Sequence, residues 1–245
     1  MVTLCEKGSE LAFLPADPYA ARITALEKTY GTNQSFAMFW VQSVDGFPVA
    51  AIARVDGNMT LCCGENSDFE ELLCFIKAVG YSSLTCSEDV MKKLGIEPSK
   101  SSLTVKYCGG ARTEADGILR DCEKRDVYDL LCSCGFELGD YSAFLADVCA
   151  RLNKKTASFA AVKNNNEIQA CAFALFEGEK SVLLGAVATK ESARGMGYAS
   201  KLVSLLAEEN SEKEVLLFCR NDNLINFYGK IGFKTVGRWA VHTAD

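Results

Sequence analysis

The spacing of apolar positions repeats in the two halves of the chain. An amphipathic stretch, Tyr19–Tyr30, follows Asp17-Pro18 in the first half, and a similar stretch, Tyr141–Asn153, follows Asp140 in the second. Aspartate accepts hydrogen bonds from the free N–H groups at a helix start, and proline fits the first helical position. The pattern therefore predicts a helix at the start of each half, and both helices run into the tripeptide Ser-Phe-Ala.

Alternating apolar segments separated by Gly-, Asn- and Asp-rich turns follow each of these helices, and this pattern predicts a three-strand antiparallel meander. A helix, an apolar strand and a short helix come next in both halves. The segments predicted for the first half are Met38–Ser43, Pro48–Val55, Met59–Cys63, Phe69–Val79, Ser82–Cys86 and Asp89–Leu94. Those predicted for the second half are Ala161–Lys163, Ile168–Phe176, Ser181–Val187, Tyr198–Glu208, Glu214–Cys219 and Leu224–Lys230.

This repetition indicates two tandem copies of an α+β fold, each a mixed, mostly antiparallel sheet flanked by helices. We place the boundary near residue 115, after the small and polar stretch Cys108–Glu114, which divides the chain into residues 1–115 and 116–245. Leu103–Tyr107 reads as a further strand that either half could own. The copies differ at one place, because the first half has no counterpart of the loop Thr189–Gly197.

Composition and charge exclude several classes of protein. Of the 245 residues, 49% are hydrophobic and 24% charged, which is typical of a globular chain with a sizeable core. The net charge of −6 and the absence of clustered Lys and Arg argue against nucleic-acid binding. Apolar runs are too short to span a membrane and the N-terminus lacks a signal-peptide pattern, so we expect no membrane partner and a cytoplasmic location.

Twelve cysteines are scattered through the chain. Several lie in apolar stretches, where a thiol behaves as a small hydrophobic group, and Cys74, Cys149, Cys171 and Cys219 are expected in the core. No Cys-x-x-Cys occurs, and His242 is the only histidine. The sequence therefore predicts neither a metal site nor a catalytic Cys-His pair.

The loop that distinguishes the second half joins the end of a strand to the start of a helix. Free backbone N–H groups and the positive end of the helix dipole converge at such a point, and glycine lets an anion approach closely. Residues Arg194–Ala199 read Arg-Gly-Met-Gly-Tyr-Ala, so Arg194 adds a fixed positive charge. The loop is a candidate phosphate-binding site.

These residues resemble a motif of the GNAT superfamily of N-acetyltransferases, Arg/Gln-x-x-Gly-x-Gly/Ala. A second motif of that family, Asn-x-x-x-x-x-x-Tyr-x-x-x-Gly-Phe, is similar to Asn221–Phe233 and lies one helix and one strand downstream. The resemblance covers most of Tyr141–Trp239, whereas the N-terminal half is similar to the family only in its layout and looks like a degenerate copy. It implies an acyl-CoA-dependent transfer of an acetyl group from acetyl-CoA to a primary amine of a small molecule or peptide.

The resemblance also implies roles for individual residues. Tyr228 matches the tyrosine that protonates the departing coenzyme A thiolate as a general acid. The strand end Val187–Thr189 should splay from Leu216–Cys219 and offer its backbone to the cofactor. The residues expected at the cofactor are Val187, Ala188, Thr189, Arg194, Gly195, Met196, Gly197, Tyr198, Ala199 and Asn221.

Several points stay open at this stage. No general base can be read, since Glu177, Glu179, Glu191 and Asp222 read as solvated turn residues, and a water relay would serve equally. The acceptor amine is unidentified, and the acyl group could be longer than acetyl. A catalytically silent CoA-binding sensor or scaffold is the alternative function. The N-terminal half could serve packing, substrate shielding or formation of a homodimer.

Aromatic residues near the first helix of each half could line a ligand site or pack in the core. Phe136, Tyr141 and Phe144 could line an acceptor cleft, although core packing is the favoured interpretation. Phe36, Phe39 and Trp40 lie in a strand-like setting that predicts burial.

Overall fold

A computed structural model describes residues 1–110 and 116–244. The N-terminal half contains three α-helices, one 3-10 helix and six strands within the described residues. They are β1 (Val2–Leu4), η1 (Gly8–Leu11), α1 (Pro18–Tyr30), β2 (Ala37–Val44), β3 (Phe47–Val55), β4 (Asn58–Cys63), α2 (Phe69–Val79), β5 (Ser83–Ser87), α3 (Glu88–Lys93) and β6 (Lys100–Tyr107).

The C-terminal half repeats this order and adds a helix before the one that opens the repeat. Its elements are β7 (Ile118–Leu119), α4 (Lys124–Ser133), α5 (Tyr141–Asn153), β8 (Ser158–Asn164), β9 (Glu167–Glu177), β10 (Ser181–Thr189), η2 (Glu191–Ala193), α6 (Tyr198–Glu209), β11 (Glu214–Phe218), η3 (Asp222–Leu224), α7 (Ile225–Lys230) and β12 (Phe233–Thr243). The predicted tandem α+β fold is confirmed, and β7, α4 and β12 lie outside the segments that the sequence pattern predicted.

All described strands join one sheet, in the order β1-β2-β3-β4-β5-β12-β6-β11-β10-β9-β8-β7. Its pairs are antiparallel except β4 with β5 and β10 with β11. A parallel pair needs a crossover connection, and α2 and α6 supply it in the two halves. The two meanders predicted from the sequence are therefore present, and each ends in a parallel strand pair.

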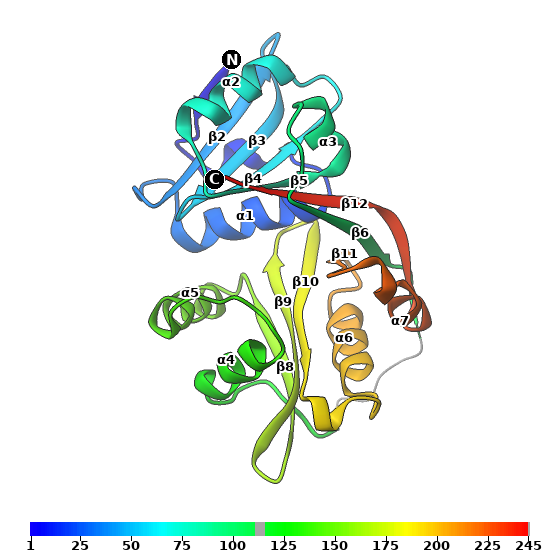
Figure 1. Ribbon diagram of the computed structural model, residues 1–245. Helices are drawn as coiled ribbons and strands as arrows, with labels where there is room; N and C mark the ends of the chain where they lie inside the picture. Colours follow the sequence, from blue (N-terminus) through cyan, green and yellow to red (C-terminus); the bar gives the residue numbers. More distant parts are fainter. Residues whose placement is uncertain (111–115, 245) are drawn as a thin grey trace.

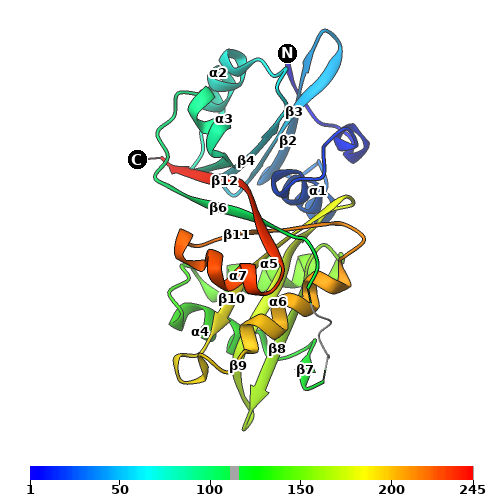
Figure 2. The same ribbon diagram turned by 90° about the vertical axis from the view of Figure 1, so that its right-hand side faces the viewer.

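The middle of the sheet is built by exchange between the halves. β12, the last strand of the chain, lies between β5 and β6, and β6 in turn separates β12 from β11. Figure 2 shows β6 and β12 crossing the molecule between the helices of the two halves. The strand Leu103–Tyr107, which either half could own, thus pairs with strands of the C-terminal half. The division at residue 115 stays a prediction, and strand pairing crosses it.

The two opening helices start as the sequence predicts. Asp17 accepts a hydrogen bond from the N–H of Ala20 (2.6 Å), and Asp140 accepts one from Ala143 (3.2 Å). Each carboxylate satisfies a helix-terminal donor that would otherwise lack a partner.

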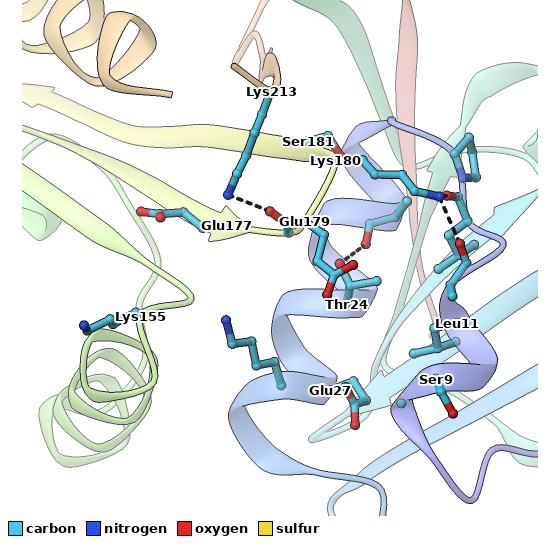
Figure 3. Close-up of a pocket in the computed structure, with 17 residues that line it drawn as sticks. Ser9, Leu11, Thr24, Glu27, Lys155, Glu177, Glu179, Lys180, Ser181 and Lys213 are labelled. Atoms are coloured by element: carbon cyan, nitrogen blue, oxygen red, sulfur yellow. Dashed lines mark hydrogen bonds between the residues drawn. The ribbon is translucent and has the colours of Figure 1, made fainter. Parts of the chain in front are cut away.

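Helix α1 also joins the two halves. Its Ala21 packs against Leu183 and Leu216 of β10 and β11, and Thr29 is hydrogen bonded to Thr156 at 2.6 Å. A cavity of about 320 Å³ lies on this seam, and Figure 3 shows the residues that line it. There Lys180 donates to the carbonyls of Ala12 (2.9 Å) and Leu14 (2.7 Å). These contacts fix the β9–β10 turn to the N-terminal half, so we regard the cavity as a structural seam.

Two expectations of burial are wrong. Phe39 and Trp40 are buried, but Phe36 is 40% exposed because it lies just before β2, beside the ring of Tyr30. Cys171 and Cys219 are buried as predicted, whereas Cys149 is only half-buried and Cys74, on α2, is exposed. All twelve cysteines lie in the described residues and all are free thiols. No helix in the described part of the chain combines the length and apolar character of a membrane span.

Candidate functional site

The parallel pair β10–β11 opens toward its carboxyl end. Residues Ser181–Leu184 pair with Glu214–Leu217, but no pairing follows beyond Leu184 and Leu217. β11 instead stays with β6, since the N–H of Cys219 donates to the carbonyl of Leu103 (2.9 Å). The splay that the resemblance implied is confirmed, and it leaves backbone groups of the end of β10 facing the gap.

A bulge in β10 lies at this opening. Gly185 pairs with Phe173 and Ala188 with Cys171, so Ala186 and Val187 together oppose one residue of β9. Ala186 adopts a φ of 47°, in the left-handed region that costs a residue with a Cβ atom free energy. Such bulges turn backbone groups away from the hydrogen bonds of the sheet. In this protein the bulged residues lie at the opening between β10 and β11.

The loop after β10 has the geometry of an anion site. Gly195 and Gly197 have φ values of 80° and 79°, a conformation that favours glycine, and Gly197 is the residue that caps α6. No side chain accepts from the first N–H groups of α6. The Arg194 side chain is 60% exposed, and its nearest acidic partner, Glu191, lies 4.0 Å away. The free backbone N–H groups at the start of α6, the positive end of its dipole and the Arg194 side chain therefore lie together in this loop.

A cavity of about 1200 Å³ joins this loop to the strand opening. Almost all residues that the sequence predicted for the cofactor line it. They are Val187, Ala188, Thr189, Arg194, Gly195, Gly197, Tyr198, Ala199 and Asn221. Met196 does not line the cavity, and its side chain is 62% exposed.

Tyr228 also lines the cavity, from the short helix α7. The side chain is 5% exposed and packs edge-on against Phe227 and Phe233, with ring centroids 4.9 and 5.8 Å away. Burial raises the pKa of Tyr228, and the nearby Cys219 raises it further. The phenol is therefore protonated at neutral pH, and no group within 1–110 or 116–244 forms a hydrogen bond with its hydroxyl.

Carboxylates suggested as bases lie outside this cavity. Asp222 accepts from Ser102 (2.8 Å) and Arg238 (2.9 Å), and these bonds lower its pKa. Glu177 accepts from Ser158, and Glu191 is almost fully exposed.

The remaining candidate, Glu179, lines the seam cavity instead. The one carboxylate among the described residues that line the larger cavity is Glu137, in the loop between α4 and α5. Sequence reasoning missed it, because no helix was predicted before that loop.

Other lining residues were also missed. They come from several parts of the sequence: Lys100 from β6, Phe218 from β11, Arg220 from the segment after β11, and Trp239 from β12. Phe136 lines the cavity as well, so its assignment to core packing is incomplete. Phe144 packs against the buried cluster of α4 and α5, as the favoured interpretation predicted. Tyr141 is half-buried and contacts Tyr128 outside that cluster. The strand exchange in the sheet is what brings Lys100 and Trp239 here.

Arg220 ties the α4–α5 loop to this site. Its guanidinium donates to the carbonyls of Cys134 (3.0 Å) and Gly135 (3.1 Å) and lies over the ring of Phe136, 5.7 Å from the centroid. The planar fork suits two carbonyls at once.

We expect Arg220→Ala to ease local opening of this loop by about 1 kcal/mol, or roughly fivefold in population. Hydrogen exchange of residues 134–139 should accelerate while exchange in α6 stays unchanged. Arg220→Lys should give an intermediate rate, since one ammonium replaces the two-armed donor. Equal exchange in all three proteins would show that Arg220 does not hold the loop.

Within the described ranges, no group of three or more His, Cys, Asp and Glu side chains is arranged to hold a metal ion. The equivalent position in the N-terminal half has a short connection and a capped helix. β4 leads through Gly64 directly to α2, whose N-terminal N–H group at Glu71 is capped by Asp68 at 3.0 Å. The uncapped, glycine-rich helix start found before α6 has no equivalent in this part of the described chain.

The splayed parallel pair, the uncapped glycine-rich helix start and the cavity between them all lie in or border the C-terminal half. Residues 154–235 match the family model of the Acetyltransferase (GNAT) domain, so this part of the chain is similar to that family. The family predicted from the two sequence motifs is confirmed for this half.

Several solved structures are similar in fold to the chain over both of its halves. A tandem GNAT protein from the clavulanic acid biosynthesis pathway is 11% identical, with 100% of this chain and 98% of that chain covered and a TM-score of 0.59. A GCN5-related N-acetyltransferase from Kribbella flavida is 12% identical, with coverage of 91% and 92% and a TM-score of 0.59.

An acetyltransferase of the GNAT family from Colwellia psychrerythraea is 12% identical, with both chains covered completely and a TM-score of 0.55. Identities this low show the fold alone. No curated protein sequence matches the chain.

Proposed function

We propose that the protein is an N-acetyltransferase that transfers the acetyl group of acetyl-CoA to a primary amine by direct attack. The observation that carries this proposal is the convergence of three features on one cavity. These are the phosphate-type loop around Arg194, the backbone opening at the end of β10, and the protonated phenol of Tyr228.

The residues present suit coenzyme A. Gly195, Gly197 and the first turn of α6 would bind the pyrophosphate through backbone N–H groups, with Arg194 supplying charge. The bulged end of β10 would hold the acyl chain by pairing its free backbone groups. A strand edge left open at a cavity is otherwise costly, so a ligand that pairs with it is favoured.

Acetyl-CoA supplies an activated acetyl group as a thioester. The amine lone pair forms the new C–N bond, the C–S bond breaks, and the leaving sulfur takes the Tyr228 phenolic proton. The amine must lose a proton in turn, and Glu137, the carboxylate among the described lining residues, can accept it through water. Tyrosine is already protonated at neutral pH, and burial raises the pKa of Tyr228 further.

Arg194→Ala tests the cofactor half of this proposal. A charged hydrogen bond contributes about 1.5–3 kcal/mol, so the Kd for acetyl-CoA should rise roughly tenfold to a hundredfold. The loss should shrink at high ionic strength because the interaction is partly solvent exposed. Titration calorimetry measures both effects. Lys77→Ala, on the exposed side of α2, serves as the control and should bind like the wild type.

A silent CoA-binding protein is the second candidate, favoured by the exposed position of Glu137 and the absence of other carboxylates among the described residues that line the cavity. A thiol-release assay with a panel of amines separates the two. Binding of acetyl-CoA without release on any amine supports the silent protein. Absence of binding would refute both.

A further inference from the structure

The two ends of the large cavity lie on opposite faces of the sheet. Helix α6 packs on one face of β8–β10, with α7 beyond it beside β12, and α4 and α5 lie on the other face (Figure 1). Leu184 and Leu217 pack in the cluster on the α6 face, whereas Leu183 and Leu216 pack against α1 on the opposite face. The cavity therefore passes through the sheet where β10 and β11 separate.

The phosphate-type loop and Tyr228 belong to the α6 face. An acyl-CoA anchored there reaches the strand opening from that side, which leaves the α4–α5 face to the acceptor. The cavity residues on that face are Phe136, Glu137, Phe218 and Trp239, together with Lys100 and Arg220.

The acceptor face has an aromatic wall. The rings of Phe218 and Trp239 stack with centroids 5.5 Å apart, and the indole N–H of Trp239 donates to the carbonyl of Cys219 (3.0 Å). That bond fixes the orientation of the indole. A rigid aromatic surface of this kind favours an apolar group on the ligand.

Charge on this face is opposite to that of the whole chain. The net charge is −6, yet Lys100 and Arg220 outnumber the single acidic lining residue, Glu137. Arg220 already donates to two carbonyls. Lys100 has no acidic partner within 1–110 or 116–244, and its ammonium lies 5.9 Å from the centroid of the Trp239 ring.

We propose that the acceptor is an amino-acid-like amine, which carries a carboxylate as well as an apolar side group. Lys100 binds the carboxylate at the edge of the aromatic wall, and Phe218 and Trp239 contact the apolar group. Glu137 faces the amine end. A polyamine is disfavoured, because its additional positive charges meet Lys100 and Arg220. This inference rests on the proposed acetyl transfer.

The test compares natural amino acids with their C-terminal amides in a thiol-release assay. Each pair keeps the amine and side group and differs in the negative charge. Wild-type protein should show at least one acid whose kcat/KM exceeds that of its amide about tenfold. Lys100→Ala should lower this acid-to-amide ratio about tenfold, and Lys100→Glu should bring it below one. Lys234→Ala, an exposed lysine on β12 outside the cavity, should keep the wild-type ratio.

Acetyl-CoA binding to every variant is measured first by calorimetry. Failure of the wild type to bind, or to release thiol with any acceptor, overturns the proposed acetyl transfer. Two other results overturn the acceptor class while leaving acetyl transfer intact. In one, the wild type binds acetyl-CoA and uses amides as well as acids. In the other, the acid-to-amide ratio of Lys100→Glu equals that of the wild type.

Discussion

Tyr228→Phe is expected to lower kcat for acetyl transfer about a hundredfold while the Kd for acetyl-CoA changes less than twofold. A positioned general acid contributes roughly 10²–10⁴-fold, and phenylalanine removes only the hydroxyl. Packing should persist, because the ring contacts with Phe227 and Phe233 do not involve that group. Stopped-flow thiol release at saturating acetyl-CoA measures kcat, and calorimetry measures binding.

Tyr107→Phe is a matched control for this experiment. Tyr107 belongs to the same aromatic group, since its ring lies 5.2 Å from that of Phe233, but it does not line the cavity. Its kcat should equal that of the wild type. An unchanged kcat in Tyr228→Phe would remove Tyr228 from the acid role and leave protonation of the thiolate to solvent.

The pH profile carries a related expectation. Burial raises the pKa of Tyr228 above its ordinary value, so the acid form persists to higher pH than in a free tyrosine. Loss of the proton on Tyr228 therefore should not limit wild-type kcat at or below pH 10.

Ending the chain before Phe233 is expected to abolish cooperative folding. This truncation removes β12 from between β5 and β6 and breaks two antiparallel ladders. It also removes the buried side chains of Phe233 and Ala240 from the cores on either side of the exchange. A domain is stable by about 5–15 kcal/mol, and loss of a central strand exceeds that margin. Circular dichroism during thermal unfolding should show no cooperative transition.

A peptide of residues 231–245 provides the control. Added to the truncated chain, it should restore a cooperative transition, whereas a scrambled peptide of the same composition should not. A truncated chain that melts cooperatively at the wild-type Tm would show that the exchanged strand is dispensable.

The local elements followed from the sequence because their signals are local. Asp17 and Asp140 satisfy helix-terminal donors within their own first turns, and the turn residues of both meanders bend the chain over a few positions. The phosphate-type loop was recognisable for the same reason, since Arg194, Gly195 and Gly197 act through the backbone of a single connection. Helix α4 was missed because its start carries no side-chain cap.

Only the tertiary structure decided how the halves share their sheet and what the acceptor meets. Strand pairing between β5, β12, β6 and β11 joins segments far apart in the sequence. Backbone donors and acceptors are alike in nearly every residue, so the sequence of a strand does not specify which strand it pairs with. Lys100 and Trp239 reach the cavity only through this exchange, and Arg220 acts on a loop far upstream. The sequence by itself determined the cofactor loop and Tyr228 as candidates, because each motif is contiguous. The acceptor face is assembled from separate strands and loops, so it could be described only in the folded chain.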